Sequence, residues 1–189
     1  SGFKSGETFT TRNLANFTLI TSSNEGAYAL AVATGSAIAE GAGAGKDPLR
    51  AFISAMNAKA EEIGLSQSYF TNPTGLDVDD WHNGGEGSAR DTAFLMEYLA
   101  LKHPEILEAT KDAATIIRDQ NGAAFRAVNT NEITKRIPGL IGSKTGFTGL
   151  AGGNLVIAYD AGLNHPIVIV ALDSTPEGRF SDVMTLIKE

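Results

Sequence analysis

The spacing of apolar residues changes near residue 114, and this change divides the chain into two parts. Before it, apolar residues recur every three or four positions, as on one face of an α-helix. After it they come in short runs rich in Val and Ile, as in the strands of a sheet. We therefore expect an α+β protein, with a helical lobe at residues 1–113 and an antiparallel sheet with a final helix at residues 114–189.

The first part predicts four helices, bounded by polar caps and by glycine. They are expected at residues 12–20, 27–33, 48–63 and 88–102. Asp47 before a proline, and Ser88 three residues before Asp91, are typical helix starts. The run 27–33 consists mostly of small residues, which favours a tightly packed, buried helix. The glycine-rich residues 41–45 predict a flexible break.

The second part predicts five strands and a closing helix. The strands are expected at residues 115–118, 125–129, 141–147, 154–160 and 166–173. Because they follow one another along the chain, we expect them to form a meander. Residues 179–189 place Phe180, Val183, Met184 and Ile187 on one face of an amphipathic helix.

Composition excludes several classes of function. The net charge of −7 and the absence of a Lys/Arg cluster argue against a nucleic-acid-binding surface. Without cysteine the chain has no disulfide, thiolate metal site or cysteine nucleophile. No apolar run reaches the roughly 18 residues of a membrane span. His82, His103 and His165 lack metal-binding spacing, so we expect no metal ion and no cofactor.

Lys144-Thr145-Gly146, on the expected strand 141–147, is the motif that points most directly to chemistry. A lysine supplies fixed positive charge, a threonine hydroxyl donates to an anionic group, and a glycine lets a ligand lie against the backbone. The triplet therefore predicts one wall of an active site.

Ser22-Ser23-Asn24 lies in the turn between the first two expected helices and matches the pattern S-x-N. A cleft between a helical lobe and a sheet edge is a usual place for a site, and this turn would face it. Ser and Asn are also favoured helix caps, so the motif has a purely structural interpretation as well.

The two motifs, in this order, resemble those of the serine penicillin-recognising enzymes, whose set is S-x-x-K, S-x-N and K-T-G. Further phrases narrow the resemblance to the low-molecular-weight penicillin-binding proteins, the D-alanyl-D-alanine carboxypeptidases. These phrases are Thr8-Phe9-Thr10-Thr11-Arg12-Asn13-Leu14, Asn72-Pro73-Thr74-Gly75-Leu76-Asp77, Ser88-Ala89-Arg90-Asp91 and Ala151-Gly152-Gly153-Asn154-Leu155. The resemblance implies the penicillin-recognising fold, here without its N-terminal strands and catalytic helix.

The resemblance implies catalytic roles for Ser22, Asn24 and Lys144. Ser22 would relay a proton and Asn24 would orient the substrate amide. Lys144 would hydrogen-bond Ser22 and keep the site positive. The implied reaction removes the last residue from peptidoglycan stem peptides through a serine acyl-enzyme.

Four further residues would bind the substrate, a peptide that ends in D-Ala-D-Ala with a free carboxylate. The resemblance implies that Thr145 grips this carboxylate and that the Phe147 N–H is an oxyanion-hole donor. Gly146, without a side chain, would let the substrate lie against the backbone. Arg179 follows the last expected strand, where the family often places a carboxylate-binding arginine. A solvated charge at the start of a helix is the alternative interpretation of Arg179. β-Lactam antibiotics are the other implied ligands, on the condition that a nucleophile segment is supplied.

The family's nucleophile is the Ser of S-x-x-K on a buried helix. One stretch of this chain matches the pattern, but we do not interpret it as the nucleophile. Ser1-Gly2-Phe3-Lys4 is the only match, and it lies at the terminus among glycines, too near Ser22. The chain is either a fragment of a longer enzyme, which we favour, or a natural variant used for binding. We expect negligible peptidase activity from this chain alone. We also expect exposed apolar surface, with partial order, a cavity or self-association as its consequence.

Two rival functions are a β-lactamase and a non-catalytic peptidoglycan-binding module. A β-lactamase shares K-T-G, but no glutamate-bearing loop for deacylation precedes Lys144, and Ser22-Ser23-Asn24 lacks the Asp of S-D-N. The family resemblance implies an extracytoplasmic location in the bacterial envelope, with no nucleic-acid partner.

Residues 77–86 form an acidic, glycine-rich loop that contains Trp81. Its Asp77, Asp79, Asp80 and Glu86 do not follow the spacing of a calcium-binding EF-hand loop. We expect a solvated loop, with a place for Trp81 at the rim of the cleft as the alternative.

Overall fold

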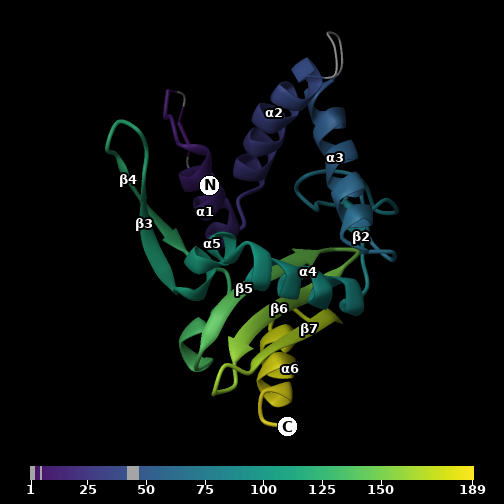
Figure 1. Ribbon diagram of the computed structural model, residues 1–189, viewed down its shortest axis with the longest axis vertical. Coiled ribbons are helices and arrows are strands. Elements are labelled where there is room, and N and C mark those ends of the chain that lie inside the picture. The colour runs from purple at the N-terminus through teal and green to yellow at the C-terminus, as the bar shows by residue number, and fades with distance from the viewer. Residues whose placement is uncertain (1–2, 5, 42–46) are drawn as a thin grey trace.

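A computed structural model describes residues 3–4, 6–41 and 47–189 of the chain (Figure 1). The α-helices are α1 (Thr11–Thr21), α2 (Asn24–Gly41), α3 (Pro48–Glu62), α4 (Ala89–Lys102), α5 (Pro104–Leu107) and α6 (Gly178–Leu186). The strands are β1 (Tyr69–Phe70), β2 (Gly85–Glu86), β3 (Ala114–Arg118), β4 (Ala124–Val128), β5 (Leu140–Thr148), β6 (Gly152–Asp160) and β7 (Pro166–Ser174). Two 3₁₀ turns are η1 (Glu108–Lys111) and η2 (Thr134–Arg136). Ser1 and most of the expected break at 41–45 lie outside the described residues.

The helices begin where their capping residues predicted. Asp47 Oδ1 accepts a hydrogen bond from the N–H of Leu49, and Ser88 Oγ accepts one from the N–H of Asp91. The Asp91 carboxylate, however, does not bond back to Ser88 as in a capping box. It is buried and accepts from the N–H of Gln67 and the hydroxyl of Ser68, so it ties the start of α4 to the preceding loop.

The main sheet has the antiparallel order β5-β6-β7 and is covered on both faces. The odd-numbered residues of β6, such as Leu155 and Ile157, pack with Val183 of α6. The even-numbered Ala158 packs with Met96 of α4. Because successive side chains of a strand point to opposite faces, α4 and α6 lie on opposite sides of the sheet. This double burial explains why β6 is an almost continuous apolar run.

The expected meander of five strands is wrong in one respect. Strands β3 and β4 form a separate two-stranded hairpin, and only the last three strands form the main sheet. The hairpin packs its buried Ile117 and Ala127 against Phe17 and Ile20 of α1, with Phe125 beside them. The apolar face of the hairpin is therefore buried against α1. Because the hairpin does not pair with β5, β5 is an edge strand of the main sheet.

The expectation of a tightly packed, buried helix at 27–33 is wrong in its bounds and in the extent of its burial. The helix is longer, from Asn24 to Gly41, and is buried only along a stripe of small residues that includes Ala31 and Gly35. The stripe lets α2 approach α3 so closely that a Cβ on Gly35 would lie 2.0 Å from the carbonyl oxygen of Pro48. Its other faces expose Tyr28 and Ile38, and Figure 1 shows the α2–α3 hairpin projecting away from the sheet.

Candidate active site

The side chain of Lys144 joins the two motifs of the sequence. It extends from β5 to the turn between α1 and α2, where its Nζ donates a hydrogen bond of 2.7 Å to Ser22 Oγ. A second bond of 2.6 Å goes to the backbone oxygen of Thr145. The predicted hydrogen bond between Lys144 and Ser22 is therefore present in the structure.

The two serines of the turn have different positions. The structural interpretation of S-x-N, a helix cap, applies to Ser23, and the functional interpretation applies to Ser22. Ser23 is buried, and its Oγ accepts from the N–H of Gly26, so Ser23 is the residue that caps α2. Ser22 ends α1 in the left-handed region, with φ 55°, and is exposed. Because Ser23 provides the cap, the Ser22 hydroxyl is available to Lys144.

Asn24 is the first residue of α2 and its side chain is exposed beside Ser22. A hollow of about 510 Å³ opens at this turn, lined by Ser22, Asn24, Arg126 and Val128 among others. A larger cavity of about 600 Å³ lies elsewhere, between α3, α4 and the strands β6 and β7, and none of the predicted site residues lines it. We therefore place the candidate site beside the smaller hollow, because its lining includes Ser22 and Asn24 and Lys144 reaches this turn through its bond to Ser22.

Thr145 is buried, and its Oγ1 lies 2.6 Å from Oγ1 of Thr130. Sequence reasoning missed Thr130, which follows β4 and donates its N–H to the backbone oxygen of Ile20 in α1. The only signal was the polar run Asn129-Thr130-Asn131 directly after a predicted strand, and nothing in it indicated Thr145 as a partner. Thr130 thus holds the Thr145 hydroxyl through a hydrogen bond.

Arg179, at the start of α6, reaches across the sheet to β5. Its Nη1 donates a hydrogen bond of 2.8 Å to the backbone oxygen of Gly146, and its guanidinium lies over the ring of Phe180. Its Nε is buried and has no hydrogen-bond partner among the described residues. Arg179 is therefore held against the Lys144-Thr145-Gly146 strand and retains an unsatisfied donor.

The site concentrates positive charge in a partly dehydrated place. Burial, and to a smaller extent the neighbouring charge of Arg179, lower the pKa of Lys144 from its ordinary value to about 8. The protonated form of Lys144 is therefore disfavoured in this site. A bound carboxylate would stabilise it, because a negative charge beside Lys144 and Arg179 offsets their mutual repulsion.

The open edge of β5 begins after Ser143. The N–H of Ser143 points away from β6 and donates to Thr110 Oγ1 of η1, so the edge is covered there. Backbone N–H groups of alternate residues point to the same side of a strand, so those of Thr145 and Phe147 also point away from β6. Phe147 itself pairs with Gly153 of β6, and the residue is 57% exposed.

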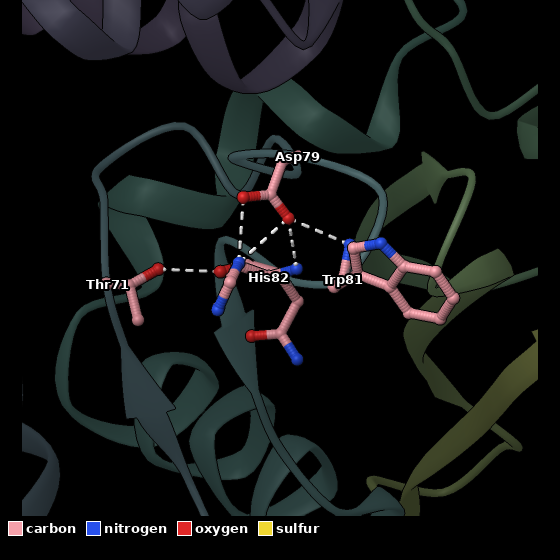
Figure 2. A network of polar contacts seen from close by, with 5 residues as sticks. Thr71, Asp79, Trp81 and His82 are labelled. Carbon is pink, nitrogen blue, oxygen red and sulfur yellow. Dashed lines mark hydrogen bonds and ion pairs between the residues drawn. The ribbon is translucent and has the colours of Figure 1, made fainter.

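The acidic loop lies against the far end of β5. Asp77 Oδ2 accepts a hydrogen bond of 3.0 Å from the N–H of Leu150, in the turn that follows β5. Asp79 accepts from the N–H groups of Trp81 and His82 and contacts His82 Nδ1, as Figure 2 shows. Within residues 3–4, 6–41 and 47–189, no three His, Cys, Asp or Glu side chains are grouped as a metal site.

A comparison with protein-family models matches residues 2–175 to the family described as D-alanyl-D-alanine carboxypeptidase. This match covers most of the chain. The chain belongs to the D-alanyl-D-alanine carboxypeptidase family. The expected α+β fold of penicillin-binding proteins is confirmed by the similar solved structures of this family.

Curated relatives of this carboxypeptidase-family chain are found in several bacteria. D-alanyl-D-alanine carboxypeptidase DacF of Bacillus subtilis is 36% identical over 136 residues, 72% of this chain and 34% of the relative. DacB2 of Mycobacterium tuberculosis is 30% identical over 177 residues, 94% of this chain and 55% of the relative. The chain thus spans between about a third and just over half of the length of these relatives.

The carboxypeptidase-family fold is also seen in Penicillin-Binding Protein D2 from Listeria monocytogenes, solved in its ampicillin-bound form. That structure matches with a TM-score of 0.75 and 29% identity, over 95% of this chain and 66% of the other. In the part of the chain that the structure describes, no helix has the length and apolarity needed to cross a membrane.

Proposed function

We propose that this chain forms the substrate-binding wall of a D-alanyl-D-alanine carboxypeptidase that trims peptidoglycan stem peptides through a serine acyl-enzyme. The observation that carries this proposal is the hydrogen bond of 2.7 Å between Lys144 Nζ and Ser22 Oγ. It joins a cation to a hydroxyl at the open edge of β5, where an extended peptide can add as a further strand.

In this proposal each residue acts on one part of the peptide. Arg179 and Thr145 bind the terminal carboxylate, and Gly146 allows the peptide to lie close to β5. The Phe147 N–H, which points to the open edge, stabilises the oxyanion of the tetrahedral intermediate.

The proton path completes the proposed mechanism. Lys144, with its pKa lowered to about 8, exchanges protons with Ser22 at neutral pH, and Ser22 passes a proton to the leaving amine. Asn24 orients the amide of the substrate beside this path.

The binding half of the proposal is tested by calorimetry with two peptides. One is Nα,Nε-diacetyl-L-Lys-D-Ala-D-Ala, and the other is the same peptide with a C-terminal amide. We expect the free acid to bind at least ten-fold more tightly, and Arg179→Gln to remove most of this difference. Equal binding of acid and amide, or no binding of either, contradicts the proposal.

The catalytic half concerns the nucleophile, which we propose is not supplied by residues 1–189. We expect the mass of 19.8 kDa to stay unchanged after exposure to excess benzylpenicillin. A stoichiometric adduct would show that a serine of this chain, with Ser1 as the first candidate, is acylated. If no adduct forms, the sequence of the full-length protein decides between the two functions. An S-x-x-K helix in that sequence indicates a carboxypeptidase, and its absence indicates a binding module.

We also propose an extracytoplasmic location in the bacterial envelope, where the stem peptides of peptidoglycan lie. Tyr28 and Ile38, which α2 exposes, support self-association of this chain at high concentration. Sedimentation velocity over a range of concentrations tests this second point, since a constant sedimentation coefficient would contradict it.

A further inference from the structure

The hydroxyls of Thr130 and Thr145 lie 2.6 Å apart, so one of them donates its hydrogen to the other. Each hydroxyl carries a single hydrogen and can accept two hydrogen bonds. If Thr145 donates to Thr130, Thr145 has no hydrogen left for a ligand. If Thr130 donates to Thr145, the hydrogen of Thr145 stays available.

The proposed ligand requires the second of these directions. A terminal carboxylate is ionised at neutral pH and only accepts hydrogen bonds. Thr145 can therefore bind it only as a donor, and Thr130 must supply the hydrogen between the two threonines. A hydroxyl that accepts such a bond is also the stronger donor, because hydrogen bonds in a chain polarise one another.

Thr130 lies in a turn that the buried side chain of Asn129 holds in place. Asn129 Nδ2 donates to the backbone oxygens of Thr110 and Asp112, at 2.8 and 2.9 Å. Its Oδ1 accepts a hydrogen bond of 2.8 Å from the N–H of Asn131, on the other side of Thr130. Both ends of the amide are therefore bonded, and they fix the turn that carries Thr130.

The backbone oxygen of Thr110 also holds the strand that carries Thr145. Ser143 Oγ donates to this oxygen at 3.2 Å, and the Ser143 N–H donates to Thr110 Oγ1 at 3.1 Å. Ser143 is two residues before Thr145, so both side chains point to the same face of β5. One buried carbonyl group thus receives bonds from Asn129 and from β5, and this sets the distance between the two threonine hydroxyls.

From this network we infer that Asn129 and Thr130 are positioning residues for the terminal carboxylate of the substrate. Thr130 donates to Thr145, and Asn129 holds Thr130 at the distance that this bond needs. Both residues act on the substrate through Thr145. The inference rests on the proposed function, since it takes Thr145 as the residue that binds the carboxylate.

The first test removes the hydroxyl of Thr130. Thr130→Val should weaken calorimetric binding of the diacetyl peptide about five-fold, and binding of its C-terminal amide less than about two-fold. The amide depends less on the direction of the Thr145 hydrogen, because it can donate as well as accept. Thr130→Ser retains a hydroxyl and should restore most of the binding of the free acid.

The ratio of acid to amide affinity separates positioning from a purely structural role, because a general disturbance of the site weakens both peptides. Thr134→Val is the matched control. Thr134 is also buried, and its Oγ1 has no hydrogen-bond partner within residues 3–4, 6–41 and 47–189. The same substitution at Thr134 should leave the ratio at its wild-type value.

The second test addresses Asn129. Asn129→Ser removes both bonds of Nδ2 and should lower the ratio in the same direction as Thr130→Val. Asn131→Ser shortens another buried asparagine, whose Nδ2 has no partner in the described part of the chain, and should leave the ratio intact. Thermal unfolding identifies the temperature at which all these variants are folded, and calorimetry is done below it.

The possible results separate the two proposals. If the wild type prefers the acid and Thr130→Val keeps the full preference, the inference is overturned and the proposed function stands. Equal losses in Thr130→Val and Thr130→Ser also overturn it, because the hydroxyl is then not the cause. An unchanged ratio in Asn129→Ser overturns the role of Asn129. Equal binding of acid and amide by the wild type, or no binding, overturns the proposed function and the inference together.

Discussion

Lys144 Nζ lies 2.7 Å from Ser22 Oγ, although the two residues are 122 positions apart in the chain. The contact joins the edge strand of the sheet to the turn between two helices. It exists because α1 is held by the β3–β4 hairpin and by Thr130, whose N–H bonds the last turn of that helix. The approach of the two motifs is therefore a property of the whole packing.

The first prediction separates the two serines of the turn. Ser23→Ala removes the cap of α2 and should lower the free energy of unfolding by about 1 kcal/mol. Ser22→Ala removes an exposed hydroxyl and should change stability by less than about 0.5 kcal/mol, yet weaken binding of the diacetyl peptide about three-fold. Thermal unfolding and calorimetry on the two variants check this, and equal effects of both on stability would contradict the assignment.

The second prediction concerns Lys144 and pH. Its pKa is about 8 in the folded protein and 10.5 as the ordinary value, so between these values the unfolded chain binds more protons than the folded one. The stability of the wild type should therefore rise with pH in this window, relative to Lys144→Met, by on the order of 3 kcal/mol in total. Urea unfolding of both proteins from pH 7 to 11 measures the difference, and parallel curves would refute it.

The third prediction tests the influence of Arg179 on Lys144. Arg179→Gln removes a nearby positive charge and should raise the pKa of Lys144 towards 10.5, without restoring it, because burial is the larger cause. Arg179→Lys keeps the charge and serves as the control, with a pKa near that of the wild type. NMR titration of the lysine side chains gives both values, and an unchanged pKa in Arg179→Gln would be the contrary result.

The fourth prediction addresses the α2–α3 hairpin. Gly35→Ala places a Cβ 2.0 Å from the oxygen of Pro48, so the helices must separate and stability should fall by about 2 kcal/mol or more. Gly41→Ala meets nothing within 4 Å and should raise stability by up to about 1 kcal/mol, since alanine is the better helix former. Chemical denaturation distinguishes the two, and a neutral Gly35→Ala would show that the close approach of the helices is not required.

Most of the secondary structure was predictable because its causes are local. The strands β3 to β7 lie within two residues of their predicted bounds, since alternation and β-branched content act over a few positions. Helix starts at Asp47 and Ser88 followed from side chains that bond N–H groups two or three residues away. The exposed faces of α2 were not predictable in this way, because a small-residue run is compatible with burial on one side or on all.

The sequence by itself determined the fold class, the motifs and the family, through patterns that each span a few neighbouring residues. Only the tertiary structure decided that Ser22 and not Ser23 faces Lys144, that Thr130 holds Thr145, and that Arg179 bonds the strand. It also decided that the acidic loop meets the end of β5 at Leu150. The physical reason is that hydrogen bonds between distant segments, and the loss of water that lowers the pKa of Lys144, depend on how the whole chain packs.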